Sequence, residues 1–384
     1  MFFRFARLQS WSWRRVVDVA IVLTVSAGIV FSIVHGQSGK KRDLHLSHGQ
    51  GYFSSRDYDR AIAEFTEAIQ LDPKCALAYA NRASCFFNQG DLEHAIDDSN
   101  RALELDPRLA AAYANRGGAY LNRGENDRAI ADCSRALELD PSSALALANR
   151  GAAYLNKGDL DGAIADCTRA LELDPHLGLA FANRAAAYFN KGKLEQTIAD
   201  CSQALRCDPV LAVAYLNRAA AFLSIGDSES AIRDCDQALR LNPNQPRAFA
   251  IRGTARFNKG EDVQGLEDDD EALRRDPNLT FVYANRGAAH LRLGDAEKAL
   301  QDFNQAIERE PHMPAAYAYR SAIFLRKHDY KQVIADCTRA IELDPQLALA
   351  YWNRGIAYAR QDDRKHAEAD QKKALELDPS FGEQ

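Results

Sequence analysis

The spacing of proline constrains this chain more than any other feature of its sequence. Ten of the twelve prolines recur at intervals of 34 residues, at positions 73, 107, 141, 175, 209, 243, 277, 311, 345 and 379. A fixed period of this length indicates an array of repeated units that stack on one another. We number positions 1 to 34 within each unit, and Ala110 is position 1 of the clearest unit, residues 110–143.

Each unit is predicted to form two short helices joined by a tight turn. At 100° per residue, positions 4, 8 and 11 fall on one helical stripe, and positions 20, 24 and 27 fall on another. Gly124 at position 15 suits the end of the first helix, and Pro141 at position 32 ends the second. Position 27 is Ala in every unit and, in an antiparallel pair, lies opposite a ring at position 4 in most units. The sequence therefore predicts an all-α chain of ten helix pairs.

The full pattern resembles the tetratricopeptide repeat family. Its elements are aromatic residues at positions 4 and 11, a small residue at 8, Ala at 20 and 27, a bulky residue at 24 and Pro at 32. The resemblance implies an α-solenoid, a right-handed superhelix of antiparallel helix pairs. The chain departs from the family pattern mainly by Arg at position 7 and Cys at position 24. We expect units at 42–75, 76–109, 110–143, 144–177, 178–211, 212–245, 246–279, 280–313, 314–347 and 348–381, and a tail at 382–384.

An apolar segment, residues 16–34, precedes the array. Twelve of its nineteen residues are Val, Ile, Leu or Phe, and as a helix it would span roughly 28 Å, close to the thickness of a bilayer core. We predict a basic flank at 1–15, a transmembrane anchor at 16–34 and a polar linker at 35–41. A cleaved signal peptide is the alternative, although no A-x-A site follows the segment. A third interpretation is a structural helix.

The charges beside this segment favour an array outside the cytoplasm, in the periplasm if the cell is bacterial. Four arginines precede the segment, and Lys40, Lys41 and Arg42 follow it, so the positive-inside rule weakly favours an N-terminus inside. The eight cysteines argue the other way, because unpaired thiols are typical of reducing compartments.

Most of the cysteines occupy position 24, which belongs to the core of the second helix. Successive units should place them about 10 Å apart, too far for a disulfide. We therefore expect buried thiols. We expect no metal, no cofactor and no catalysis, because no metal-ligand spacing, phosphate loop or nucleophile elbow occurs. The net charge is −6 with both signs interspersed, so nucleic acid is not an expected partner.

Arginine at position 7 and aspartate at position 23 occur in the same nine units. The two positions stand at one level across the hairpin, which predicts a structural ion pair in each unit. An arginine ladder that binds an acidic ligand is the functional alternative. The predicted pairs include Arg82–Asp98, Arg116–Asp132, Arg150–Asp166, Arg184–Asp200 and Arg218–Asp234.

Position 6 is asparagine in seven units and points away from its partner helix. The family resemblance implies that this face lines a concave groove. An amide both donates and accepts, which suits the backbone of an extended peptide, and a similar asparagine ladder is found in the O-linked N-acetylglucosamine transferase family. Alternatively, these asparagines bond to neighbouring helices and only support the stacking. The asparagines are Asn81, Asn115, Asn149, Asn183, Asn217, Asn285 and Asn353.

The later units change this face. Arg292 and Arg326 stand at position 13, where earlier units have asparagine, so the C-terminal third of the groove is predicted to suit acidic peptides.

Two units depart from the core pattern. In unit seven Arg256 replaces the aromatic residue at position 11 and Asp269 occupies position 24. An Arg256–Asp269 pair in a less stable unit is one interpretation, and a flexible weak link is the other. In unit ten Glu368 replaces the usual Ile or Leu at position 21, which predicts a polar cap at the end of the array.

These features favour a membrane-anchored, non-enzymatic scaffold that binds protein partners, as extended peptides, in its groove. A regulatory or substrate-positioning subunit of an enzyme complex is the alternative from another class. A soluble exported protein, after signal-peptide cleavage, and a purely structural spacer are further alternatives.

Overall fold

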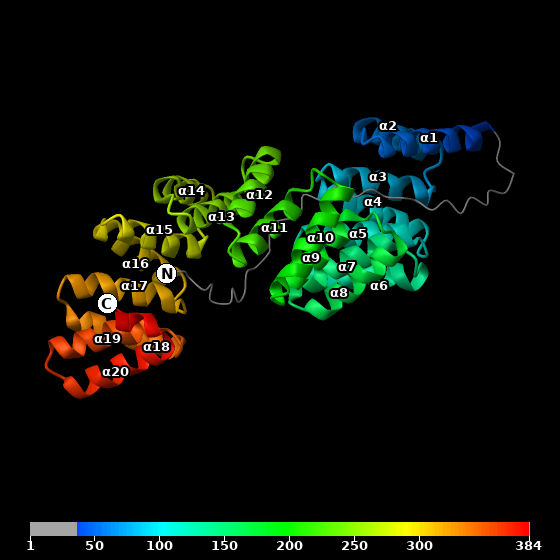
Figure 1. Cartoon of the computed structure of the whole chain (residues 1–384). Coiled ribbons are helices and arrows are strands. Elements are labelled where there is room, and N and C mark those ends of the chain that lie inside the picture. The colour runs from blue at the N-terminus through cyan, green and yellow to red at the C-terminus, as the bar shows by residue number, and fades with distance from the viewer. Residues whose placement is uncertain (1–36, 384) are drawn as a thin grey trace. The chain divides into compact units, whose positions relative to one another are not determined.

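The computed structural model describes residues 37–383, and Figure 1 shows their arrangement. Within that range the regular structure consists of twenty α-helices and one short 3-10 helix, with no β-strand. The described chain divides into two compact parts, residues 37–226 and 227–383. The prediction of an all-α solenoid of helix pairs is confirmed.

The N-terminal part holds eleven helices. Each odd-numbered helix from α1 to α9 packs against the even-numbered helix that follows it. The helices are α1 (Gln37–Ser54), α2 (Tyr58–Leu71), α3 (Ala76–Asn88), α4 (Leu92–Leu105), α5 (Ala110–Asn122), α6 (Asn126–Leu139), α7 (Ala144–Lys157), α8 (Leu160–Leu173), α9 (Gly178–Asn190), α10 (Leu194–Cys207) and α11 (Ala212–Ser224).

The C-terminal part begins inside the sixth sequence unit, between the two helices of that unit. From α13 onward its helices pack in the same pairwise order. They are α12 (Ser228–Leu241), α13 (Pro246–Asn258), α14 (Asp262–Arg275), α15 (Thr280–Arg292), α16 (Ala296–Arg309), α17 (Pro314–Arg326), α18 (Tyr330–Leu343), α19 (Ala348–Arg360), α20 (Arg364–Leu377) and the 3-10 helix η1 (Pro379–Glu383).

Acidic side chains mark both ends of the second helices. Asp91 at position 16 accepts the backbone N–H of His94 at 3.2 Å, which satisfies one of the free donors of the first turn. After the helix, Asp106 at position 31 accepts the backbone N–H of Arg108 at 2.9 Å. This turn and the proline at position 32 stop the helix. The same N-cap occurs at Asp57, Asp159, Asp227, Asp295, Asp329 and Asp363.

The turn between the two helices requires a left-handed backbone at position 15 of every unit. Seven units place glycine there, with φ between 72° and 88°, and glycine adopts this conformation without a steric penalty. Units one, nine and ten instead have Arg56, His328 and Asp362, with φ of 61°, 59° and 63°. These three turns are therefore strained relative to the others.

The core of each hairpin is narrow and depends on small side chains. A Cβ added to Gly117 at position 8 would lie 2.6 Å from Sγ of Cys133 at position 24. Ala129 at position 20 and Ala136 at position 27 are fully buried. Small residues at these positions therefore let the two backbones approach while cysteine or phenylalanine fills position 24.

The predictions for the N-terminus concern mainly residues that precede the described range. Helix α1 begins at Gln37, so residues 37–41 continue the first helix and do not form the predicted linker. The basic flank at 1–15 and the anchor at 16–34 lie outside the described residues. Among residues 37–383, no helix combines the length and apolarity needed to cross a membrane.

Unit seven contains a buried carboxylate in place of the predicted ion pair. Arg256 Nη1 lies 2.9 Å from Asp268, so the prediction of an Arg256–Asp269 pair was wrong. Asp269 is fully buried, and neither of its side-chain oxygens has a hydrogen-bond partner. Position 24 faces Gly253 at position 8, whose added Cβ would lie 2.6 Å from Asp269 Oδ1, and this places the carboxylate away from Arg256.

The last hairpin exposes the polar residues of its second helix. Glu368 is exposed, and Gln371 is half-buried. Phe381 in η1 is 8% exposed and stacks on Trp352 with a centroid distance of 5.1 Å. This aromatic contact therefore covers part of α19, the first helix of the last hairpin.

Candidate peptide-binding groove

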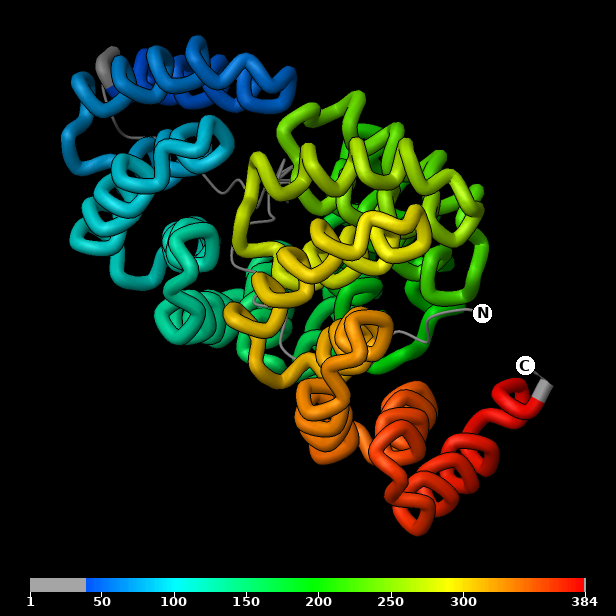
Figure 2. The backbone as a smooth tube through the Cα atoms, turned by 90° about the vertical axis from the view of Figure 1, so that its left-hand side faces the viewer, coloured from blue at the N-terminus to red at the C-terminus, as the bar shows by residue number. Residues whose placement is uncertain are grey.

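The first helices of successive hairpins form the inner face of the N-terminal part. Helices α3 and α5, α5 and α7, and α7 and α9 contact each other, whereas successive second helices such as α4 and α6 do not approach comparably. Hairpins that approach on one side only must curve toward that side, as Figure 2 shows. In the C-terminal part, α13, α15, α17 and α19 contact one another in sequence in the same way. We call positions 2, 5, 6, 9, 12 and 13 of the first helices the groove.

Four consecutive asparagines at position 6 join neighbouring first helices. Each donates its side-chain N–H to the backbone carbonyl at position 5 of the preceding unit, at distances from 2.9 Å for Asn115 to 3.5 Å for Asn217. All four side chains are buried, with Asn149 only 2% exposed. The acceptors for Asn115, Asn149, Asn183 and Asn217 are Ala80, Ala114, Ala148 and Ala182.

The other three asparagines differ from this row. Asn81 is half-buried and forms no hydrogen bond within the described residues. Asn285 donates to the hydroxyl of Thr254 at 2.9 Å. Asn353 donates to the carbonyl of Ala318 at 3.3 Å and lies 3.0 Å from the Ser321 hydroxyl. The asparagine row is therefore regular only in the N-terminal part.

These bonds fix the orientation of the four amides. Only the NH₂ group can donate to a carbonyl, and it uses one of its two N–H groups, so Oδ1 and the second N–H remain available. Within residues 37–383, the Oδ1 atoms of Asn115, Asn149, Asn183 and Asn217 accept no hydrogen bond, and none is enclosed away from solvent. The inner face thus holds four neutral acceptors, one in each of units three to six, on side chains that are only 2–8% exposed.

The position-7 arginines bind the position-23 aspartates of their own unit through two parallel hydrogen bonds. Arg116 Nε and Nη2 donate to the two carboxylate oxygens of Asp132 at 2.7 and 2.8 Å, and these bonds raise the pKa of Arg116. The same arrangement joins Arg82 to Asp98, Arg150 to Asp166, Arg184 to Asp200, Arg252 to Asp268, Arg286 to Asp302, Arg320 to Asp336 and Arg354 to Asp370. Arg218 and Asp234 belong to different parts, so their pairing stays a prediction.

The third guanidinium nitrogen connects neighbouring units. Arg116 Nη1 donates to Asn100 Oδ1 at 2.7 Å, and Arg150 Nη1 donates to the Ser134 hydroxyl at 3.1 Å. Arg116 also lies over the rings of Tyr113 and Tyr120, 5.6 and 5.9 Å from their centroids. Each guanidinium group of this row thus donates to partners inside the protein and packs against aromatic rings. The row therefore has little capacity left to bind an acidic ligand.

The two arginines predicted to make the later groove basic have different surroundings. Arg292 pairs with Asp262, with Nη2 and Oδ1 2.5 Å apart, and its guanidinium lies over the ring of Phe257. Its charge is therefore largely balanced. Arg326 is exposed and has no ion-pair partner within residues 37–383.

The cysteines belong to the core. All eight are free, and six of them are buried. Burial raises the pKa of Cys85 and of Cys167 to about 12, so these thiols stay protonated and act as small apolar groups. Among the described residues, no group of His, Cys, Asp and Glu side chains could hold a metal ion.

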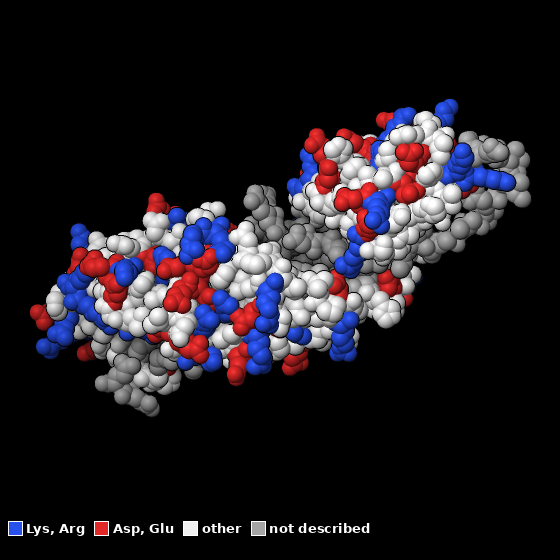
Figure 3. Space-filling view, turned by 90° about the horizontal axis from the view of Figure 1, so that it is seen from above, with Lys and Arg blue, Asp and Glu red and all other residues white. Residues whose placement is uncertain are grey.

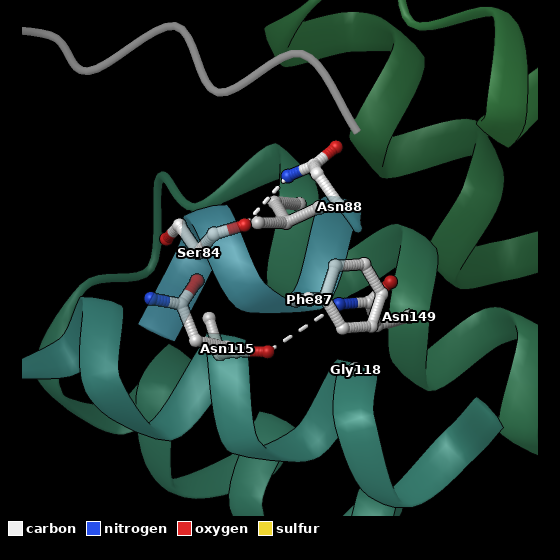
Figure 4. A pocket seen from close by; sticks show the side chains of 8 residues that line it. Ser84, Phe87, Asn88, Asn115, Gly118 and Asn149 are labelled. Carbon is white, nitrogen blue, oxygen red and sulfur yellow. Dashed lines mark hydrogen bonds between the residues drawn. The ribbon is translucent and has the colours of Figure 1, made fainter. Parts of the chain in front are cut away.

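A small pocket opens in the groove where α3, α5 and α7 meet. Figure 4 shows Gly118 of α5 beneath the ring of Phe87 and the amide of Asn149. Sequence reasoning missed this pocket, although position 9 is glycine only in unit three. The lining residues are Ser84, Phe87, Asn88, Ala114, Asn115, Gly118, Leu145 and Asn149.

Stacked helix pairs with an inner face of small and amide side chains define a helical-repeat solenoid. The tetratricopeptide repeat family model matches residues 46–110, 110–143, 144–177, 212–245, 281–313 and 348–381, more than half of the chain. The chain therefore belongs to the tetratricopeptide repeat family. No curated protein matches it in sequence.

Several solved structures are similar to the chain. The APC/C hetero-tetramer Cut9–Hcn1 matches with a TM-score of 0.62 at 16% identity, over 82% of this chain and 76% of that chain. PilF from Pseudomonas aeruginosa matches with a TM-score of 0.48 at 20% identity, over 54% and 94%. A tetratricopeptide repeat protein from Parabacteroides merdae gives 0.46 at 18%, over 65% and 99%. At 16% identity the similarity to Cut9–Hcn1 shows the fold alone.

Proposed function

We propose that the chain is a non-enzymatic scaffold that binds protein partners as extended peptide segments in its groove. The observation that carries this proposal is the row of free amide oxygens on Asn115, Asn149, Asn183 and Asn217. An extended peptide presents backbone N–H groups along its length, and neutral acceptors bind them without selecting a sequence.

The position-6 amides then have two roles at once. Their NH₂ groups hold the first helices at a fixed separation, and their oxygens face the partner. This arrangement joins the structural and the ligand-binding interpretations of the asparagines. A groove held rigid by its own stacking loses little conformational freedom on binding, which favours affinity.

Surface charge supports a protein partner over a nucleic acid. Lysine and arginine side chains intermix with aspartate and glutamate on the face seen in Figure 3, and the net charge is −6. A nucleic-acid site needs clustered positive charge to displace the counterions of the phosphates.

The experiment is a binding measurement on selected peptides. A random peptide library is selected on the full-length chain in detergent, and enriched peptides are titrated by fluorescence anisotropy. Replacing Asn149, Asn183 and Asn217 together by alanine removes three acceptors and should weaken binding by tenfold or more. Glu138→Ala with Glu172→Ala, on the exposed faces of α6 and α8, is the control and should leave binding unchanged. Equal affinity for the triple variant and the wild type would refute groove binding.

We further propose that residues 16–34 anchor the array to a membrane as a single-pass helix, with the array outside the cytoplasm. The apolar run and its basic flank support this proposal. The full-length chain should co-float with liposomes, and a chain without residues 1–34 should not. The mass of the mature protein separates an anchor from a cleaved signal peptide, because cleavage removes the segment.

The alternative function is a subunit that positions substrates for an enzyme. A catalytic partner that co-purifies with the chain, and whose activity depends on the groove asparagines, would favour it.

A further inference from the structure

Unit three differs from the other nine units at position 9, which lies in the groove between neighbouring first helices. Gly118 is the only glycine at this position, and the equivalent residues in units two and four are Ser84 and Ala152. Glycine in a helix interior is less favourable than alanine, because it loses more conformational freedom on folding. Gly118 lies in the middle of α5 and is not among the glycines with positive φ, so the backbone conformation does not require glycine there.

The absent side chain leaves a defined space. A Cβ added to Gly118 would lie 3.0 Å from Asn149 Nδ2 and 3.5 Å from the nearest ring carbon of Phe87. A methyl group on residue 118 would therefore crowd the Asn149 amide, and a larger side chain at this position would not fit. The resulting pocket is open to the groove and takes about a single water molecule.

The pocket contains amide donors and acceptors, and one N–H of each amide is already used. The amide nitrogens of Asn88, Asn115 and Asn149 already donate to the carbonyls of Ser84, Ala80 and Ala114. Figure 4 shows two of these bonds, from Asn88 and Asn149. The Oδ1 atoms of Asn115 and Asn149 are left as acceptors beside the apolar surface of Phe87.

This chemistry limits what can enter. Carboxylate and phosphate groups are larger than the single water molecule that the pocket takes. An ammonium group would lose much of its hydration without a carboxylate in the lining to compensate it. A methyl or hydroxymethyl group beside a backbone N–H satisfies both the size and the polarity of the pocket.

We propose that the Gly118 pocket is a size-selective subsite that takes one small residue of the bound peptide, glycine, alanine or serine. The backbone N–H beside that residue donates to Oδ1 of Asn115 or Asn149. The inference rests on the proposed function, because it assigns specificity within the same groove. It adds that the groove reads one position of its partner by size.

The test uses peptides selected from a random library on the full-length chain. Each position of one selected peptide is replaced in turn by glycine, alanine, serine and leucine, and affinities are measured by fluorescence anisotropy. One position should tolerate only the three small residues, and leucine there should weaken binding by about tenfold or more. Gly118→Ala fills the pocket and should shift the preference at that position from alanine to glycine.

The control is Gly51→Ala in α1, because the space around Gly51 is empty within 4 Å. It makes the same exchange inside a helix and should leave the preference unchanged. If Gly118→Ala does not fold, Ala152→Gly serves as the test variant. It opens the equivalent space in unit four and should create a second position that prefers alanine over bulkier residues.

The outcomes separate the two proposals. Binding that needs Asn149, Asn183 and Asn217 but shows no size-restricted position would overturn the subsite and leave groove binding intact. An unchanged preference in a folded Gly118→Ala variant would overturn it as well. Failure of any peptide to bind through the asparagines would overturn both proposals.

Discussion

At the scale of single residues, the consecutive aspartates of unit seven have opposite surroundings. Asp268 accepts hydrogen bonds from two nitrogens of Arg252 and lies 2.9 Å from Arg256. Asp269, the next residue, is fully buried and its oxygens accept no hydrogen bond. Burial raises the pKa of Asp269 well above its ordinary value. A carboxylate in such a place destabilises the fold whenever it is ionised.

We therefore predict that Asp269→Cys stabilises the C-terminal part. Cysteine occupies position 24 in five other units, and the substitution removes an unpaired buried group worth about 1–3 kcal/mol. The measurement is urea unfolding. Asp268→Asn is the matched control and should destabilise, because it breaks the double hydrogen bond to Arg252. Destabilisation by both substitutions would contradict the assignment.

The same residue predicts a pH dependence. The folded pKa of Asp269 is raised, so protonation of this carboxyl group favours the folded state. This contribution to stability is fully present below the unfolded pKa of about 3.8 and is lost as pH rises through the folded pKa. The gain in melting temperature from Asp269→Cys should thus be larger at pH 8 than at pH 5. Charged groups of Arg286, Asp302 and Asp270 also act on this carboxyl group. If the gain in melting temperature became smaller as pH rises, ionisation of Asp269 would be excluded as its cause.

The arginine of each bidentate pair should be essential to its unit. Arg150 pairs with the buried Asp166, so Arg150→Ala leaves an uncompensated carboxylate and should cost about 3–5 kcal/mol. Arg135 forms an exposed pair with Glu138 at 2.6 Å, and Arg135→Ala should cost less than about 1 kcal/mol. Thermal unfolding distinguishes the two, and an unchanged melting temperature for Arg150→Ala would contradict the structural pairing.

At the scale of helices and turns, the residue type at position 15 decides whether the left-handed turn between the two helices is strained. Arg56 holds φ of 61° in a turn where seven other units have glycine, and a left-handed backbone costs a residue with a Cβ about 1–2 kcal/mol. Arg56→Gly should therefore stabilise the first hairpin by up to about 1 kcal/mol after the added freedom of the unfolded chain is counted.

The reverse exchange provides the control for that prediction. Gly158 has φ of 83°, and a Cβ added there would meet no atom within 4 Å. Gly158→Ala should destabilise through the backbone alone. Hydrogen exchange of the hairpin amides measures both effects, and the same sign for both variants would contradict the explanation.

The hairpins could be predicted from the sequence because their determinants are local and repeat with the period. Gly124, Pro141 and the alanines at positions 20 and 27 each impose one step of the same geometry. The partner of Arg256 could not be predicted, because position 24 and position 23 differ by a single residue on the helix. Only the packing of Asp269 against Gly253 decides which carboxylate Arg256 meets.

Prediction of the candidate site was less complete for a related reason. The periodic asparagines and the face that they share could be read from the sequence, but the choice of amide atom could not. That choice depends on the carbonyl of the preceding unit, such as Ala114 for Asn149. The pocket at Gly118 breaks the period, and a pattern that emphasises recurrence does not reveal it.

At the scale of the whole molecule, the hairpin cores share one pattern of buried thiols. Six of the eight cysteines are buried, and Cys75 and Cys207 are half-buried. We predict that only these two react quickly with a thiol reagent in the native chain, and that all eight react after unfolding. Rapid reaction of more than two thiols would show that the hairpin cores open readily.

The division at residue 226 is also a property of the whole chain. It falls between the two helices of unit six, although Gly226 at position 15 matches the glycine of six other units. The local pattern is therefore continuous there, and the sequence alone does not predict the division.

The central claim is that the free amide oxygens of the inner face receive the backbone of a partner peptide. A crystal structure of the full-length chain with a selected peptide tests it most directly. The account predicts a peptide extended across α5, α7 and α9, with backbone N–H groups donating to Oδ1 of Asn149 and Asn183. A peptide bound to the second helices, or one that leaves these oxygens in contact with water, would contradict it.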